Sequence, residues 1–584
     1  MTLTALDWSI IGAYFLLSLI IGIVVSKKSG SSASEFFLSG RSMPWWLLGV
    51  SMVATTFSAD TPNLVTQLVR EGGVAGNWAW WAFLLTGMLT VFVYAKLWRR
   101  SGVLTDLEFY ELRYSGKEAA FLRGFRAIYL GVFFNVAIMA SVCLAAVKIG
   151  SIMLGLSPEQ TLTIACVITV IYSAIGGYKG VLWTDFFQFF LAMVGAVWAA
   201  YEVLSMPEIG GLSQLIAHEN VKPLTSFFPD FSKPAEYIPL LLVPLAVQWW
   251  SVWYPGAEPG GGGYIAQRML SAKDEKNAIG ATLFFNVMHY AARPWPWIIV
   301  ALASVVVYPN LASIQSAFPN LDAAQIGNDL AYPAMLTHMP EGLRGLIMAS
   351  LMAAFMSTIS THLNWGSSYI VNDFYLRFIN QKASDKQQVR VGRLSIVLLM
   401  ACGGLLSFFI ESAKAGFDIL LSIGAGTGLI FILRWFWWRI NAYTEIAGMV
   451  ISFIVAVAMQ IIKPFDEAHS YLNLITSVAV TTLGWLIVTF ITPPTDRTTL
   501  RTFFLKIKPH GKGWLQFLHA SDDTTVKGSL STEIICMVLG CFAVYLALFG
   551  IGFMVYSAHI SAAVCIAASV VCGGLLFYFF RSNK

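Results

Sequence analysis

Long apolar runs alternate with short polar connections along nearly the whole chain. Apolar runs of about 18 residues or more lie near 7–26, 44–66, 77–95, 127–152, 159–176, 181–204, 236–254, 280–307, 343–370, 394–410, 416–433, 443–462, 469–491, 533–556 and 558–580. A helix needs roughly 20 residues to cross the hydrocarbon of a bilayer. The pattern therefore predicts an all-α polytopic membrane protein with about 15 spans.

Composition agrees with this class and excludes a soluble enzyme. Hydrophobic residues make up 57% of the 584 residues, charged residues only 12%, and the mean hydropathy is +0.68. The formal net charge is +5, but the basic residues concentrate in the connections on one side of the predicted spans. Among those we assign to inner connections are Arg113, Arg126, Arg268 and Arg434. Positive charge marks the cytoplasmic side, so we expect a multi-pass protein of the cell membrane. Its N-terminus would be outside and its C-terminus cytoplasmic, with the bilayer and not nucleic acid as its partner.

The stretch 43–69 is long enough to span, yet its centre carries Thr55, Thr56, Ser58, Asp60, Thr61 and Pro62. Unpaired backbone groups and buried charges are costly in hydrocarbon, so such a break persists only where it lines a cavity inside the protein. We expect residues 54–62 to be an unwound hinge that offers carbonyl oxygens to a cation or a polar solute. The alternative is a proline kink satisfied by neighbouring helices.

A second break follows at 249–268, WWSVWYPGAEPGGGGYIAQR. Its prolines and glycines cannot continue a helix. It opens a second block of five spans, as the first break opens the first block. Interrupted helices at matching positions of two halves indicate an inverted-repeat transporter with its site at the midplane.

This organisation predicts six regions. They are an extra N-terminal span with an inner loop (1–43), two five-helix repeats (44–204 and 236–433), peripheral spans (443–491), a cytoplasmic loop (492–531) and C-terminal spans (532–584).

Residues Ala354, Ser357 and Thr358 are spaced i, i+3 and i+4, so one carbonyl and two hydroxyls share a helical face. The carbonyls of Ala54 and Phe57 at the first break would complete a cage of about five oxygens, which suits sodium. Alternatively, the hydroxyls bond back to carbonyls one turn earlier. Asp185, near the start of a span, is either a helix cap or a cation ligand.

A stripe of Asn286, His289 and Arg293 shares one face of the span 280–307. Polar groups in such a stripe should face a cavity, although Arg293 could instead snorkel to an interface. For Trp78, Trp80 and Trp81 we favour an interfacial aromatic belt over a stacking platform for a solute. The predicted solute-binding residues are Asp60, Thr61, Trp253, Tyr254, Glu258, Asn286, His289 and Arg293.

Three motifs carry a resemblance to the sodium/solute symporter family, whose members have a LeuT-type fold with discontinuous first and sixth core helices. They are GGYKGVLWTDFFQ (176–188), QRMLSAK (267–273) and ASLMAAFMSTISTHLN (349–364) followed by VNDFY. The resemblance implies a sodium site at Ala54, Phe57, Ala354, Ser357 and Thr358, with Asp185 affecting a second ion or coupling. Glutamines that sugar-transporting relatives use correspond here to Thr61 and Leu421, which departs from a glucose or galactose pattern.

Together these features predict a symporter in which sodium drives the import of a small polar organic solute, with a sugar favoured over a carboxylate-bearing solute. A membrane sensor with the same fold and no net transport is the competing class. The sequence contains no metalloprotease motif, nucleophile elbow or phosphate loop, which argues against an enzyme. A channel would share the polar interior without uphill accumulation.

Overall fold

Helices follow the predicted apolar runs. The computed structural model describes residues 3–26, 33–252, 258–321, 326–410, 421, 424–466, 469–526 and 528–582. Within these residues, ten helical segments are long and apolar enough to cross a membrane: Val74–Ser101, Gly116–Leu154, Gly177–Ser205, Glu275–Val307, Leu343–Ile379, Asp385–Phe409, Ala442–Ile462, Tyr471–Ile491, Leu530–Val555 and His559–Ser582. Shorter or interrupted apolar helices occupy the other predicted spans that fall on described residues, so the helical class is confirmed.

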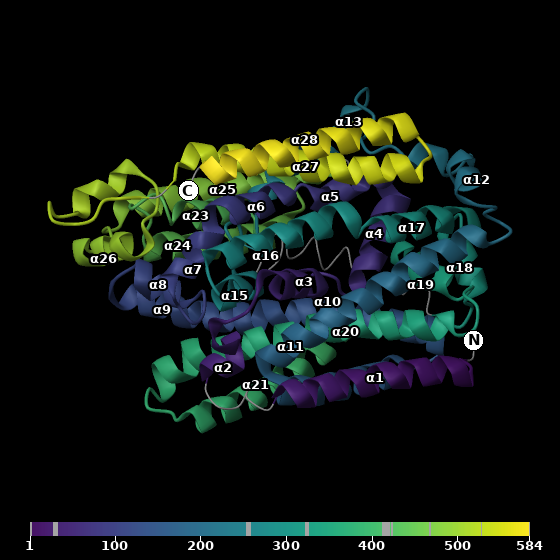
Figure 1. Ribbon diagram of the computed structural model, residues 1–584, viewed down its shortest axis with the longest axis horizontal. Coiled ribbons are helices and arrows are strands. Elements are labelled where there is room, and N and C mark those ends of the chain that lie inside the picture. Colours follow the sequence, from purple (N-terminus) through teal and green to yellow (C-terminus); the bar gives the residue numbers. More distant parts are fainter. Residues whose placement is uncertain are drawn as a thin grey trace.

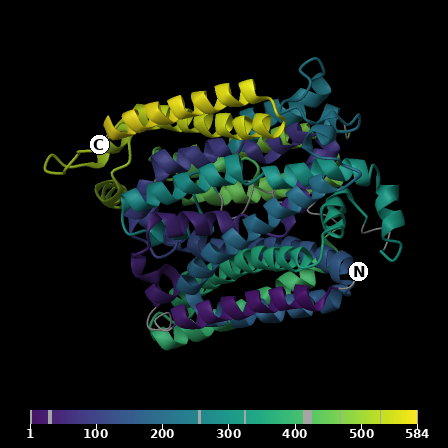
Figure 2. The same ribbon diagram turned by 45° about the vertical axis from the view of Figure 1, so that its right-hand side comes forward.

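The long helices run side by side along one direction, and the two termini lie at opposite ends of the molecule (Figure 1). The C-terminal pair, α27 (Leu530–Val555) and α28 (His559–Ser582), forms one edge of the bundle, whereas α1 (Ala5–Ser26) and α21 (Asp385–Leu406) lie at the opposite edge. Figure 2 shows the helices between these edges as stacked layers. Helices α24 (Ala442–Ile462) and α25 (Tyr471–Ile491) pack against each other, and α26 (Arg497–Ile507) follows at the end that carries the C-terminus.

The first expected break is present. Helix α3 (Trp45–Thr55) ends and α4 (Asp60–Gly72) begins five residues further on, leaving residues 56–59 outside any helix. The chain turns at Thr56, whose φ and ψ are −84° and 0°. Pro62 lies in the first turn of α4, where its missing N–H leaves no intrahelical bond unmade. The break therefore places the carbonyl end of one short helix beside the amide end of another.

The second expected break is present as well. Helix α14 (Val243–Ala246) and the short turn η7 (Gln248–Trp250) stop before residue 251, and α15 (Gly263–Ser271) begins only at the last glycine of the run 260–263. Gly260, Gly261 and Gly263 all have positive φ, a conformation that favours glycine. The chain then continues through α16 (Glu275–Val287), the π-turn η8 (Met288–Ala292) and α17 (Trp295–Val307).

Helix α20 (Leu343–Ser368) lies beside the first break and packs against α1, α3, α10 (Asn135–Leu154) and α11 (Pro158–Ser205). A single residue, Gly177, with φ 56°, divides α11 into the two predicted spans. The approach of α11 to α20 is close, since a Cβ at Gly195 would lie 2.6 Å from the Ser350 hydroxyl. Small residues of this kind let membrane helices pack tightly.

Four of the basic residues assigned from the sequence to inner connections have buried side chains: Arg113, Arg126, Arg268 and Arg434. Arg126 and Arg434 are satisfied by carboxylates, because Arg126 pairs with Glu258 and Arg434 lies 3.5 Å from Glu445. Buried charges of opposite sign can stay ionised together, which explains how these side chains are accommodated away from solvent.

Candidate functional site

Two hydroxyls of α20, those of Ser357 and Thr358, bond to other helices and not back to their own. Thr358 Oγ1 donates to the backbone oxygen of Thr55 at 2.9 Å. Ser357 Oγ donates to Asp185 Oδ1 at 2.7 Å. The alternative that these two hydroxyls bond back to carbonyls one turn earlier is therefore wrong, and both hydroxyls lie between helices.

The other predicted cage residues lie beside these hydroxyls. Ala54, Phe57 and Ala354 are each 2% exposed. The oxygen of Ala54 accepts from the Phe57 amide at 3.1 Å, and this bond closes the last turn of α3. The end of α3 and the middle of α20 thus bring together the oxygen types that a sodium ion prefers, neutral carbonyls and hydroxyls.

Asp185 is completely buried and joins three helices. One carboxylate oxygen accepts from Ser357 of α20, and the other accepts from Ser51 of α3 at 2.5 Å. The guanidinium of Arg268 on α15 lies 3.5 Å from the same carboxylate. Because Asp185 is eight residues past Gly177, deep within its span, it is a core carboxylate and not a helix cap.

Arg268 extends this cluster toward the break. It donates to Ser51, to Thr55 Oγ1 at 3.1 Å and to Thr361 Oγ1 at 2.9 Å. Sequence reasoning missed these contacts. The motif that contains Arg268 was visible, but its charge was counted toward membrane topology and not toward the site.

A second polar cluster lies on the opposite side of the break. Thr56 Oγ1 is 3.1 Å from His289 Nδ1 and 3.3 Å from Arg293 Nη1. Arg293 also donates to the oxygen of Val53 at 3.1 Å, and its Nε has no hydrogen-bond partner. At 1% exposed, Arg293 does not snorkel. His289 and Arg293, two of the predicted solute-binding residues, therefore meet at the break through Thr56. The sequence analysis noted Thr56 in the break but did not include it among the solute-binding residues.

Aromatic rings surround this cluster. Trp80 stacks on Tyr290 with ring centroids 5.7 Å apart and meets the His289 ring edge-on at 5.4 Å. The Arg293 guanidinium lies over the rings of Phe57 and Trp297. Trp78, Trp80 and Trp81 are all buried, so the expected aromatic belt is wrong for these three side chains. Rings from α27, from η8 and from the segment 227–228 cover them.

A small cavity of about 40 Å³ opens beside the aromatic cluster. Glu258, Asn286, Thr56 and Tyr290 contribute to its wall. Asn286 donates to Thr282 in its own helix, and its side-chain oxygen has no partner. A cavity of this volume has room for water, and the unpaired amide oxygen is an acceptor that a hydroxyl-bearing solute could use.

The remaining predicted solute residues are more dispersed. Asp60 accepts a hydrogen bond from the Ser58 hydroxyl within the break, and the Thr61 hydroxyl accepts from the Ser58 amide at 3.3 Å. Glu258 pairs with Arg126 and lies 3.8 Å from Arg434, so it is shared between the small cavity and an ion-pair cluster. Trp253 and Tyr254 lie outside the described residues.

Comparison with known proteins identifies the family. The family model "Sodium:solute symporter family" matches residues 36–452, which is most of the chain. The sodium/glucose cotransporter 1 of Oryctolagus cuniculus is 26% identical over 486 residues, covering 78% of this chain and 72% of the relative. The sodium/glucose cotransporter of Vibrio parahaemolyticus is 25% identical over 501 residues, covering 82% and 90%.

Among solved structures, a Na⁺-coupled sialic acid symporter in a substrate-bound outward-open state superposes with a TM-score of 0.66 at 21% identity, covering 84% of this chain and 99% of that one. This likeness shows the fold, which is the LeuT type with two discontinuous helices. The chain belongs to the sodium:solute symporter family. It is an integral multi-pass membrane protein and a symporter that uses sodium as its coupling ion.

Proposed function

We propose that the protein imports a small polar organic solute together with sodium by alternating access, with the ion held between the first break and α20. The observation that carries this proposal is the pair of α20 hydroxyls that reach the break and Asp185. In the proposed cage the carbonyls of Ala54, Phe57 and Ala354 and the hydroxyls of Ser357 and Thr358 bind the ion. Asp185 supplies negative charge behind Ser357 and is the candidate for a second ion site.

Coupling follows if sodium binds one arrangement of α20 and the break more tightly than the other. An ion can shift a conformational equilibrium only by its differential affinity for the two states. The contacts of Thr358 with Thr55 and of Ser357 with Asp185 are the groups that an ion would draw toward itself. Such a shift would fix the position of Thr56, immediately after Thr55, and with it the cluster of His289 and Arg293.

For the solute we place a sugar or sugar-like molecule first and a carboxylate-bearing molecule second. The Tyr290 ring lines the small cavity and offers a face on which a sugar ring can stack, and the Asn286 oxygen can accept from a hydroxyl. The two named relatives are sodium/glucose cotransporters, which favours the same class. Arg293 supports the second candidate, because a guanidinium binds a carboxylate with planar, paired hydrogen bonds.

The direction and membrane also belong to the proposal. The termini lie at opposite ends of the bundle, as a chain with an odd number of spans requires (Figure 1). With the N-terminus outside and the C-terminus cytoplasmic, the loop 492–531 is on the inner surface of the cell membrane. The inverted repeats would comprise residues 44–204 and 236–433.

Uptake into proteoliposomes tests the proposal directly. A panel of radiolabelled hexoses, acidic sugars and short carboxylates would be offered under an inward sodium gradient, and then under an equal potassium gradient. We expect one solute class to accumulate above its external concentration only with sodium. Binding of a solute without accumulation under either gradient would favour the sensor and contradict symport.

A further inference from the structure

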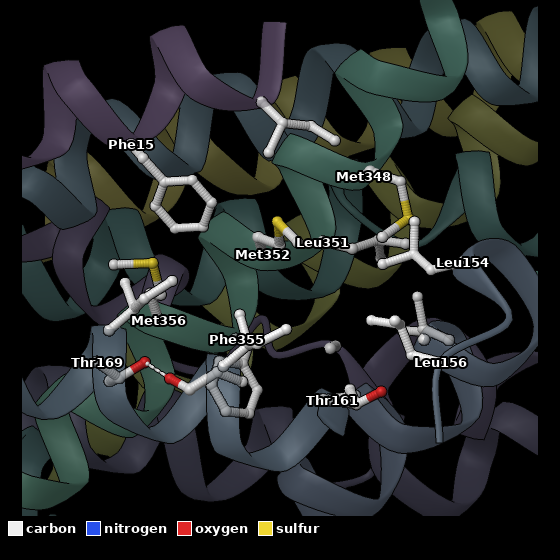
Figure 3. A pocket seen from close by; sticks show the side chains of 18 of the residues that line it. Phe15, Leu154, Leu156, Thr161, Thr169, Met348, Leu351, Met352, Phe355 and Met356 are labelled. Carbon is white, nitrogen blue, oxygen red and sulfur yellow. Dashed lines mark hydrogen bonds between the residues drawn. The ribbon is translucent and has the colours of Figure 1, made fainter. Parts of the chain in front are cut away.

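An apolar cavity of about 350 Å³ lies between α1, α10, the first half of α11 and α20. Figure 3 shows its lining from close by, with Phe15 of α1 facing Met352 and Met356 of α20, and Leu154 and Leu156 at the other end. This cavity is separate from the polar clusters described above. One residue of the first break, Ala59, also lines it.

The lining offers almost nothing to a polar molecule. Thr169 turns its hydroxyl back to the oxygen of Ala165 at 2.7 Å, so that group is already satisfied. The other side chains that line the cavity are carbon or thioether groups, except Thr161 and the indole of Trp8. An engineered apolar cavity of about 150 Å³ in another protein stays dry and binds benzene. A cavity more than twice that size and equally apolar is therefore a site for hydrocarbon and not for water.

The surface around the cavity identifies the source of that hydrocarbon. Ile164 and Trp8, which line it, are 48% and 54% exposed, and Val167 beside them is 52% exposed. In a membrane-spanning bundle, large apolar side chains exposed at this depth face the acyl region of the bilayer. The cavity is thus continuous with the lipid-facing surface of α1 and α11.

One polar atom marks an end of the cavity. The Thr161 hydroxyl is buried and has no hydrogen-bond partner. Thr161 lies beside Leu154 and Leu156, close to where α10 ends and α11 begins (Figure 3). An unpaired buried hydroxyl is costly, and an ester carbonyl at the head of an acyl chain is an acceptor of suitable chemistry.

We propose that this cavity binds one acyl chain of a bilayer phospholipid, with the chain lying along α20 and its ester next to Thr161. The chain packs against Met348, Met352 and Met356, which recur every four residues on one face of α20. Methionine side chains are flexible and adapt to irregular apolar partners. Ser357 projects from another face of the same helix, so the chain and the polar cluster contact opposite sides of α20.

Photochemical labelling in lipid nanodiscs tests the site on the whole protein. A phospholipid with a diazirine near the end of one acyl chain would be photolysed, and the adducts mapped by mass spectrometry. We expect adducts on Ile11 and Met356, which are only 2% and 3% exposed and which bulk lipid does not reach. Adducts confined to freely exposed residues such as those of α28 would overturn the proposal.

Gly12 provides the matched variant. It lines the cavity, and a Cβ added there meets no atom within 4 Å, so Gly12→Leu can place a larger side chain at the space that the acyl chain would occupy. Gly573 on α28 also has nothing within 4 Å, and Gly573→Leu adds the same side chain far from the cavity. We expect Gly12→Leu to lose the adducts on Met356 and Gly573→Leu to keep them. Equal labelling of both variants would contradict an acyl-chain site.

Thr161→Val keeps the shape of the side chain and removes the hydroxyl. We expect fewer adducts on Met356 in this variant, with the thermal midpoint unchanged, because only the contact to the ester is lost. Adducts at the wild-type level would show that Thr161 does not hold the polar end as proposed. These experiments need no transport, so they distinguish the acyl-chain site from the proposed symport.

Discussion

Replacing Ser357 with alanine removes the one side chain that contacts Asp185 and belongs to the proposed sodium cage. The variant loses a 2.7 Å hydrogen bond to a buried carboxylate and one of about five ion ligands. A hydrogen bond to a charged group contributes about 1.5–3 kcal/mol. Since 1.4 kcal/mol corresponds to tenfold in affinity, we expect the sodium concentration for half-maximal uptake to rise roughly 10- to 100-fold.

The assay is uptake at increasing sodium, together with the shift of the thermal unfolding midpoint that sodium produces. Ser350→Ala is the matched control, because Ser350 lies on the same helix, is equally buried and bonds only to Ile347 of its own helix at 2.8 Å. We expect the control to keep the wild-type response to sodium. If Ser357→Ala kept the wild-type half-saturation and the wild-type thermal shift, the proposed cage would be refuted.

Three further predictions concern charged groups. Asp185→Asn leaves the Arg268 guanidinium buried without its counter-charge, so we expect the free energy of unfolding to fall by about 3–5 kcal/mol. Denaturation in detergent would measure this change. Adding Arg268→Met to the variant should recover part of the lost stability. Arg293→Met should raise the half-saturation of a carboxylate-bearing solute roughly 10- to 100-fold while sodium still stabilises the protein; an unchanged value in uptake assays would exclude Arg293 from the solute site. In the loop 492–531, hydrogen bonds from Arg501 lower the pKa of Asp522 to about 2. The Arg501–Asp522 ion pair therefore stabilises the folded loop above about pH 4, and this stabilisation is lost as the pH falls toward 2. NMR of labelled aspartate would measure the pKa of Asp522, and an ordinary value would contradict the pairing.

Both breaks in the core helices could be predicted from the sequence, because proline, glycine and a carboxylate inside an apolar run have a local cost. The α20 hydroxyls could also be placed, since Ser357 and Thr358 follow Ala354 at i+3 and i+4 and so flank it on one side of the helix. These features depend only on residues a few positions apart. The pattern therefore carried enough information to find them.

Partners distant in sequence could not be found in this way. Arg268 lies 83 residues from Asp185, and no periodicity links the two. A count of loop charges carries no information on burial, so it did not indicate that Arg126 and Arg434 are buried beside carboxylates. The tryptophans at 78–81 were misjudged for the same reason, because an aromatic belt and a buried stack have the same local sequence.

Reversal of the coupling tests the central claim most directly. Binding linkage is reciprocal, so if sodium drives the solute, an inward gradient of the solute must drive sodium. Proteoliposomes containing the protein and equal sodium on both sides would be given the transported solute outside, with radioactive sodium as the tracer. We predict that sodium accumulates transiently inside the proteoliposomes. Ser357→Ala should weaken this accumulation, and Ser350→Ala should leave it unchanged. Solute entry without any movement of sodium would contradict the account.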